Sequence, residues 1–271
     1  MQRAGAIYKL VLTTVVCASG CTTPAERIER AAHNAGFEKQ ILSGSRFDHL
    51  IFSGNLDRSE GARLHVYVEG DGSPWIANRW IAEDPTPRNP IALELMRIDP
   101  GPALYLGRPC YFGLRRNCTP ELWTKGRYSE GVVRAMADAL KAALGKVGFS
   151  GNIVLIGYSG GGTLAMLLTS HVAAVDTLIT VAANQDVNRW TEYHGYSPLT
   201  TSLNPAQQAP LPDHIIQIHL LGGSDENVPA ELVIPAIDRQ PNATLVRYTE
   251  YTHECCWTEV WPSTLEKIER R

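Results

Sequence analysis

The stretch Asn152-Ile-Val-Leu-Ile-Gly-Tyr-Ser-Gly-Gly-Gly-Thr-Leu164 is an apolar run that ends at a serine between glycines and continues with helix-forming residues. Its pattern predicts a buried strand, a sharp turn at Ser159 and a helix over Thr163 to Ser170. Gly157 and Gly161 complete a Gly-x-Ser-x-Gly motif, in which strand and helix approach too closely for side chains. Such a nucleophile elbow holds a serine hydroxyl clear of the backbone, beside the free N–H groups of a helix N-terminus. The alternative is a tight glycine-rich turn with a surface serine.

Length and composition favour one α/β domain. The chain has 271 residues, of which 44% are hydrophobic, so it can bury a large core. The formal net charge is -3 and the basic residues are scattered along the chain. Nucleic acid is therefore not an expected partner.

The first twenty residues read as an export signal. Arg3 and Lys9 precede a short apolar stretch, Leu10 to Ser19, that is too short to span a bilayer. The following Ala-Ser-Gly-Cys21 resembles a bacterial lipobox, which implies a signal peptide over residues 1–20 and lipidation of Cys21. Thr22, rather than an acidic residue, follows the cysteine, which resembles the sorting signal of outer-membrane lipoproteins. We therefore expect a lipid-anchored protein of the cell envelope, in the outer membrane and facing the periplasm. The alternative is an ordinary secretory signal that leaves a soluble periplasmic protein.

The cysteines fit an oxidising compartment. Apart from Cys17 and Cys21, four remain, and Cys110 and Cys118 are close enough in sequence to form a disulfide that closes one loop. Cys255 and Cys256 are adjacent, so they form a strained vicinal disulfide, stay as thiols or pair with the other two; we favour the first. A metal site that includes His253 is the remaining option, but adjacent cysteines converge poorly on one ion, and no metal is expected.

Strands and helices alternate along the chain, which predicts a mainly parallel sheet with helices on both faces. Residues 183–212 form a long polar and aromatic segment between two such elements, which is unusual unless it has a function. The predicted strands are Phe47–Ser53 and Leu64–Glu69 as a first pair, then Ala103–Leu106, the apolar run from Ile153 that stops at Gly157, Thr177–Ala182, His214–Leu221 and Thr244–Tyr248. The predicted helices are Pro24–Ala35, Pro90–Ile98, Tyr128–Val147 and Thr163–Ser170, with a loop over Trp75–Asn89.

Three further motifs follow predicted strands. Glu69-Gly-Asp-Gly72 follows the second strand, Gly222-Gly-Ser-Asp225-Glu-Asn-Val-Pro229 follows the strand at His214 to Leu221, and Tyr251-Thr-His253 follows the last strand. With the elbow, these motifs cover residues 64–253 and resemble the α/β-hydrolase superfamily. The Glu-Gly-Asp-Gly, Asp-Pro-Thr-Pro-Arg, Arg-Pro-Cys and His-x-Cys-Cys-Trp motifs more narrowly resemble exported bacterial α/β-hydrolase lipoproteins.

The resemblance implies a catalytic triad of Ser159, Asp225 and His253, in the chain order of α/β-hydrolases. In such a triad the histidine is the base, and the carboxylate fixes its tautomer and stabilises the imidazolium. Asp186 is the alternative acid, at a position known in some lipases, whereas His214 and His219 are expected to be packing residues within a strand.

The same resemblance assigns the oxyanion hole to the backbone N–H groups of Asp71 and Gly160. Acidic residues at positions 69 and 71 would oppose a developing negative charge unless they pair or turn away, and Arg79 and Arg88 are available counter-ions. A plain β-turn is the alternative for this segment.

Together these features predict a single domain over residues 21–271 with an α/β-hydrolase fold and a possible lid at 183–212. The expected function is hydrolysis of a small-molecule ester or thioester through an acyl-serine, without a cofactor and with no protein partner predicted. The alternatives are a non-catalytic envelope binding protein of the same fold, or a peptidase or acyltransferase that uses the same triad.

Overall fold

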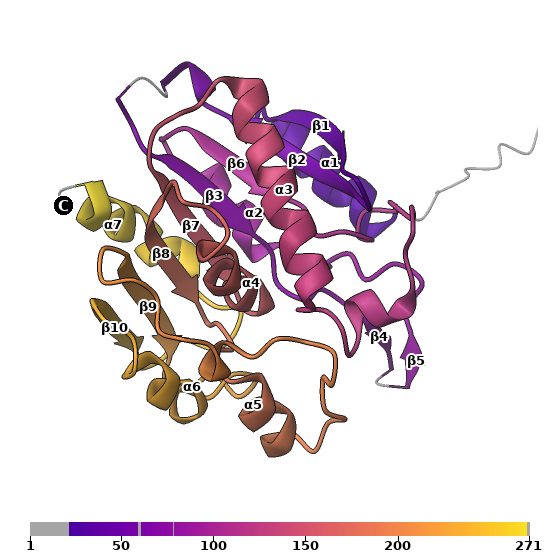
Figure 1. Cartoon of the computed structure of the whole chain (residues 1–271), viewed down its shortest axis with the longest axis vertical. Coiled ribbons are helices and arrows are strands. Elements are labelled where there is room, and N and C mark those ends of the chain that lie inside the picture. The colour runs from indigo at the N-terminus through magenta and orange to yellow at the C-terminus, as the bar shows by residue number, and fades with distance from the viewer. Residues whose placement is uncertain (1–21, 59–60, 78, 270–271) are drawn as a thin grey trace, which may run out of the picture.

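A computed structural model describes residues 22–269, apart from residues 59, 60 and 78. The predicted signal peptide and Cys21 therefore lie outside the described residues. An eight-stranded sheet forms the centre of the molecule, in the order β1-β2-β6-β3-β7-β8-β9-β10 (Figure 1). Neighbouring strands from β6 to β10 are parallel, whereas β2 pairs in the antiparallel sense with both β1 and β6. The strands are β1 (Glu38–Ser43), β2 (Asp48–Gly54), β3 (Leu64–Val68), β6 (Ala103–Leu106), β7 (Ile153–Tyr158), β8 (Val175–Val181), β9 (Ile216–Gly222) and β10 (Ala243–Tyr248).

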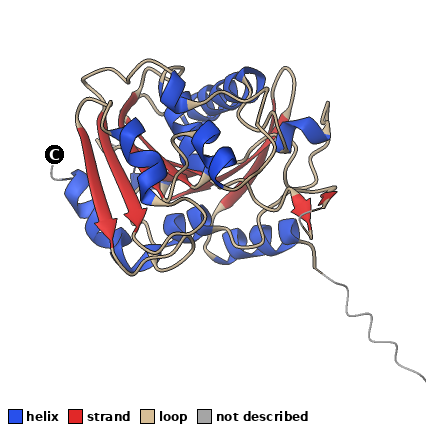
Figure 2. Ribbon diagram, turned by 90° about the horizontal axis from the view of Figure 1, so that it is seen from below, coloured by secondary structure: helices blue, strands red, loops and turns tan. Residues whose placement is uncertain are grey.

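Helices cover both faces of this sheet because its central strands are apolar on both sides. Every residue of β3, β6 and β7 is buried. Helices α3 and α4 pack on one face, and α1, α2 and α7 pack on the other, so that the core has two layers (Figures 1 and 2). The helices are α1 (Pro24–Asn34), α2 (Ile91–Arg97), α3 (Glu130–Val147), α4 (Gly160–Thr169), α5 (Val187–Tyr193), α6 (Ala230–Ile237) and α7 (Trp257–Glu269).

This architecture confirms the predicted α/β fold, but it differs from the prediction in several details. Strand β1 and the helices α5, α6 and α7 were not predicted. The first two predicted strands are not neighbours, because β6 lies between β2 and β3. The predicted loop after Trp75 contains a short hairpin of β4 (Trp75–Ile76) and β5 (Trp80–Ile81). His214 precedes β9 and is exposed, so it is not a packing residue within a strand.

The parallel strands determine where the candidate site lies. Ser159, Asp225 and His253 follow β7, β9 and β10, and Asp71 follows β3. The carboxyl ends of parallel strands share one edge of a sheet, so these segments of the chain converge there. No helix within the described residues is long and apolar enough to cross a membrane.

Candidate active site

Ser159 occupies the turn between β7 and α4, in a backbone conformation that non-glycine residues seldom adopt. Its φ is 51° and its ψ is -126°. The flanking glycines allow this turn: a Cβ at Gly157 would overlap the backbone of Gly161, and a Cβ at Gly161 would overlap the carbonyl oxygen of Val68 at the end of β3. The geometry is that of a nucleophile elbow, with the serine at its apex.

A line of hydrogen bonds joins the serine to a histidine and a carboxylate. The Nε2 atom of His253 lies 3.0 Å from Oγ of Ser159, and its Nδ1 atom lies 2.9 Å from Oδ2 of Asp225. The Asp225 side chain is fully buried, whereas that of His253 is 16% exposed. A serine hydroxyl in this arrangement can transfer its proton to the imidazole, and the buried carboxylate can stabilise the charge that results.

Neighbouring groups fix the histidine and the carboxylate in place. The Tyr158 hydroxyl and the Trp257 indole N–H both donate to the carbonyl oxygen of His253, at 3.2 and 2.8 Å. The Tyr158 ring also packs against the imidazole, with 5.3 Å between ring centroids. The other carboxylate oxygen of Asp225 accepts hydrogen bonds from the backbone N–H groups of Asn227 and Val228. The triad geometry is thus held by the turns that follow β9 and β10.

Asp225, rather than the alternative Asp186, is the carboxylate that contacts His253. Asp186 instead caps the N-terminus of α5, where its carboxylate accepts hydrogen bonds from the backbone N–H of Arg189 and the side chain of Asn204. His219 is a buried packing residue, as predicted, and burial lowers its pKa to about 4.

The turn after β3 lies directly beside the elbow. A Cβ at Gly70 would be 3.3 Å from the Cβ of Ser159, and a Cβ at Gly160 would overlap Oδ1 of Asp71. Gly160 is the first residue of α4, so its N–H has no acceptor within the helix. Among the described residues, 22–269 without 59, 60 and 78, neither the Gly160 nor the Asp71 N–H donates to a protein acceptor. Both amides are therefore free to donate a hydrogen bond to a ligand.

The carboxylate of Asp71 is neutralised by two buried guanidinium groups. Arg108 Nη1 and Arg127 Nη1 lie 2.6 and 2.9 Å from its oxygens, and the Tyr128 hydroxyl donates to it at 2.5 Å. Burial alone would raise the pKa of Asp71, but the charges of Arg127 and Arg108 outweigh burial and hold this pKa well below its usual value. The Tyr111 hydroxyl also donates to the Asp71 carbonyl oxygen.

These partners correct the sequence-based choice of counter-ions. Arg79 stacks on Trp80, and neither Arg79 nor Arg88 forms an ion pair with a described residue. Arg108 is the arginine of the Arg-Pro-Cys motif, to which the sequence analysis assigns no function. Arg127 and Tyr128 precede α3 and carry no motif, so only the fold brings them to Asp71.

The second carboxylate of this turn is hydrogen-bonded to the backbone at the start of α2. Glu69 is buried and accepts hydrogen bonds from the backbone N–H groups of Gly70, Ala92 and Leu93, the last two in the first turn of α2. Burial raises the pKa of Glu69 to about 7, although these hydrogen bonds favour its ionised form. Both acidic residues of the turn therefore have partners, Asp71 with two arginines and Glu69 with backbone N–H groups of α2.

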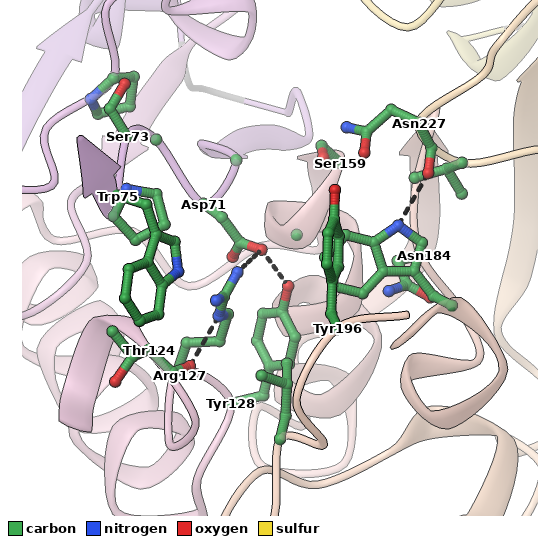
Figure 3. A pocket seen from close by; sticks show the side chains of 18 of the residues that line it. Asp71, Ser73, Trp75, Thr124, Arg127, Tyr128, Ser159, Asn184, Tyr196 and Asn227 are labelled. Carbon is green, nitrogen blue, oxygen red and sulfur yellow. Dashed lines mark hydrogen bonds and ion pairs between the residues drawn. The ribbon is translucent and has the colours of Figure 1, made fainter. Parts of the chain in front are cut away.

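A pocket of about 1040 Å³ opens at Ser159 and His253. One wall comes from the β4–β5 hairpin through Trp75 and Ile81, and the opposite wall comes from the 183–212 segment, including Trp190 and Tyr196. Figure 3 shows Trp75 and Tyr196 on opposite sides, with Asp71, Arg127 and Tyr128 between them. The pocket has both aromatic and cationic lining residues; the cations are Arg88, Lys125 and Arg127.

The cysteines pair within two local segments. Cys110 and Cys118 form a disulfide with an S–S distance of 2.04 Å, and this bond closes the loop after β6. Cys255 and Cys256 are joined as a vicinal disulfide, separated from His253 by Glu254. Among the described residues, no group of three histidine, cysteine or acidic side chains is placed to hold a metal ion.

Comparison with solved structures finds the same architecture in α/β hydrolases. An esterase from Pyrococcus furiosus matches with a TM-score of 0.63 and 15% identity, over 97% of this chain and 98% of that chain. Mouse α/β hydrolase domain-containing protein 10 matches with a TM-score of 0.57 and 15% identity, over 86% and 99%. An α/β serine hydrolase without a lid from Xanthomonas campestris matches with a TM-score of 0.56 and 12% identity, over 86% and 94%. The chain therefore has an α/β-hydrolase fold, although neither a protein-family model nor a curated protein sequence matches it.

Proposed function

We propose that the protein is a serine hydrolase that cleaves a carboxylic ester or thioester through an acyl-serine intermediate. The observation that carries this proposal is the continuous line of hydrogen bonds from Ser159 through His253 to the buried Asp225. A surface serine in a glycine-rich turn would need no such partners. The solved esterase and α/β hydrolases of the same fold support the assignment to a hydrolase.

In the proposed reaction His253 accepts the Ser159 proton while Oγ attacks the carbonyl carbon of the substrate. Asp225 keeps the imidazole in the tautomer that presents Nε2 to the serine, and it stabilises the imidazolium. The backbone N–H groups of Asp71 and Gly160 bind the oxyanion of the tetrahedral intermediate. The leaving group then takes the proton from His253, which gives the acyl-serine. A water molecule activated by the same histidine releases the acid and restores the serine.

The electrostatics of the acidic turn agree with this chemistry. A free carboxylate at Asp71 would destabilise a developing oxyanion beside Gly160. Arg108 and Arg127 cancel that charge, so the Asp71 amide is held beside the elbow without a net opposing charge on its side chain. The acidic residues of this turn therefore do not by themselves favour the alternative of a non-catalytic binding protein.

Two other functions use the same fold. A non-catalytic binding protein would keep the pocket but not react through Ser159, and a peptidase or acyltransferase would share the acyl-serine and differ in leaving group or acceptor. No motif in the sequence marks a peptide-binding subsite, so a small ester is the first substrate to test. We further propose that Cys21 carries lipid and that the protein faces the periplasm from the outer membrane, as the sequence before Thr22 indicates.

The test is turnover of short p-nitrophenyl esters by residues 22–271, which contain all the described helices and strands. The proposal predicts that Ser159→Ala lowers turnover by about 10⁶-fold relative to the parent chain, as in other serine hydrolases with this triad. Equal turnover by the two chains would overturn it. Product analysis with an added alcohol or amine acceptor separates hydrolysis from acyl transfer.

A further inference from the structure

The β4–β5 hairpin exposes large apolar side chains at all four of its paired positions. Trp75 pairs with Ile81 and Ile76 pairs with Trp80, and these side chains are between 42% and 62% exposed. An isolated two-stranded ribbon that is apolar along both strands gains little stability in water. Contiguous exposed apolar residues of this kind typically mark an interaction surface.

The base of the hairpin is fixed, so the apolar tip is held in a defined position. The Ala82 N–H donates to the carbonyl oxygen of Pro74, and the buried Trp123 indole N–H donates to the carbonyl oxygen of Ala82. The backbone N–H of Ser73 likewise donates to the carbonyl oxygen of Pro85. The exposed side chains are therefore displayed by a rigid support.

The charged residues on and beside the hairpin are two exposed arginines, the acidic Glu83, and Asp84, whose carboxylate accepts hydrogen bonds from Thr86. Arg79 lies in its turn, with its guanidinium 5.1 Å from the centre of the Trp80 ring, and Arg88 is exposed on the adjoining loop. Neither arginine has an acidic partner among the described residues. The nearby Glu83 is paired with Arg115. A tip that combines tryptophan, isoleucine and unpaired arginine matches the interface of an anionic lipid bilayer, where aromatic rings lie at the headgroup level.

The position of the predicted lipid anchor points to the same occupant. Helix α1 begins at Pro24, only three residues after Cys21, and three residues span at most about 10 Å. A lipid on Cys21 would therefore hold the N-terminal end of α1 at the membrane surface. In both Figure 1 and Figure 2 the β4–β5 hairpin lies on the same side of the molecule as that end of α1.

We propose that the β4–β5 hairpin is a membrane-docking element that inserts Ile76 and Trp80 into the interface of a bilayer containing anionic phospholipid. Trp75 and Ile81 line the pocket, so docking places one wall of the pocket at the membrane. This inference goes beyond the proposed hydrolase activity and does not depend on it, because binding to lipid requires no reaction at Ser159.

The test is cosedimentation of residues 22–271, which lack the anchor, with vesicles of phosphatidylethanolamine and phosphatidylglycerol. The parent chain should bind these vesicles, bind phosphatidylcholine vesicles more weakly, and show a blue shift of tryptophan fluorescence. The double variant Ile76→Ser/Trp80→Ser changes neither pocket-lining residue and should weaken binding at least about tenfold, with ester turnover in solution unchanged.

The matched control is Ile41→Ser, because Ile41 is 47% exposed on the edge strand β1, away from the hairpin. It should bind vesicles like the parent chain, and so should Ser159→Ala. A parent chain that does not bind, or a double variant that binds equally well, would overturn the proposal. A parent chain that is a dimer in solution and becomes a monomer on the double substitution would also overturn it, because the occupant would then be a second copy of the chain.

Discussion

The imidazole of His253 lies 3.0 Å from the hydroxyl oxygen of Ser159, although 94 positions separate the two residues in the chain. One residue follows β7 and the other follows β10, at the same edge of the sheet. Two hydrogen bonds to the carbonyl oxygen of His253 fix its position. One comes from Tyr158, the residue before the serine, and the other from Trp257 at the start of α7. This contact is the basis of the catalytic proposal.

Asp225→Asn should reduce kcat by about 10³- to 10⁴-fold with little change in stability. The amide cannot stabilise an imidazolium, and it favours the wrong tautomer of His253. Ester turnover and thermal unfolding of the variant measure the two effects. Asp186→Asn is the matched control: asparagine caps a helix about as well as aspartate, so stability should change little and turnover should be retained. If Asp186→Asn, and not Asp225→Asn, abolished turnover, the triad assignment would be wrong.

Gly160→Ala should lower kcat by about 10²- to 10³-fold. The added methyl group would overlap Oδ1 of Asp71 and lie 2.5 Å from the Tyr128 hydroxyl, so the turn that carries the Asp71 amide must move. The control is Gly145→Ala in α3, where a Cβ meets no atom within 4 Å and stability should rise slightly. Unchanged turnover by Gly160→Ala would exclude this oxyanion hole.

Asp71→Asn should destabilise the fold by about 3 kcal/mol, because it leaves the buried guanidinium groups of Arg108 and Arg127 without a counter-ion. Chemical denaturation measures the difference. The control is Glu83→Gln, which breaks an exposed pair with Arg115 and should change stability by less than about 1 kcal/mol. Similar effects of the two substitutions would mean that the Asp71 pairs contribute no more than surface pairs.

The fold should lose stability as pH rises through the range in which Glu69 titrates. The unfolded chain releases this proton near pH 4.5 and the folded chain near pH 7, so folding becomes less favourable across that window, by up to about 3 kcal/mol. Denaturation at pH 5 and pH 8 measures the change. In Glu69→Gln the decrease should be smaller, and an identical pH dependence in both chains would refute the role of Glu69.

The sequence predicted most of the parallel sheet because its central strands are rich in apolar residues and end at or next to a glycine, as β7 does. It missed β1, in which only one residue is buried, and the β4–β5 hairpin, whose side chains are exposed. Neither segment has the alternating or continuous pattern of apolar residues from which a buried strand is predicted.

Only those residues of the candidate site that belong to sequence motifs were predicted. Ser159, Asp225 and His253 each follow a recognisable strand, and their positions in the fold bring them together. Arg127 and Tyr128 reach Asp71 from the segment before α3, more than 50 positions away in sequence. No local pattern marks such a pair, because the partnership depends on how α3 packs against the sheet.

The most direct test of the central claim is labelling of residues 22–271 with a fluorophosphonate, followed by peptide mass spectrometry to locate the adduct. The reagent requires an activated serine but not the natural substrate, so it tests the triad without knowledge of the ester. The account predicts one adduct, on Ser159, which His253→Ala should abolish. A folded chain that forms no adduct, or forms it on another residue, would contradict the account and favour a binding protein with a degenerate site.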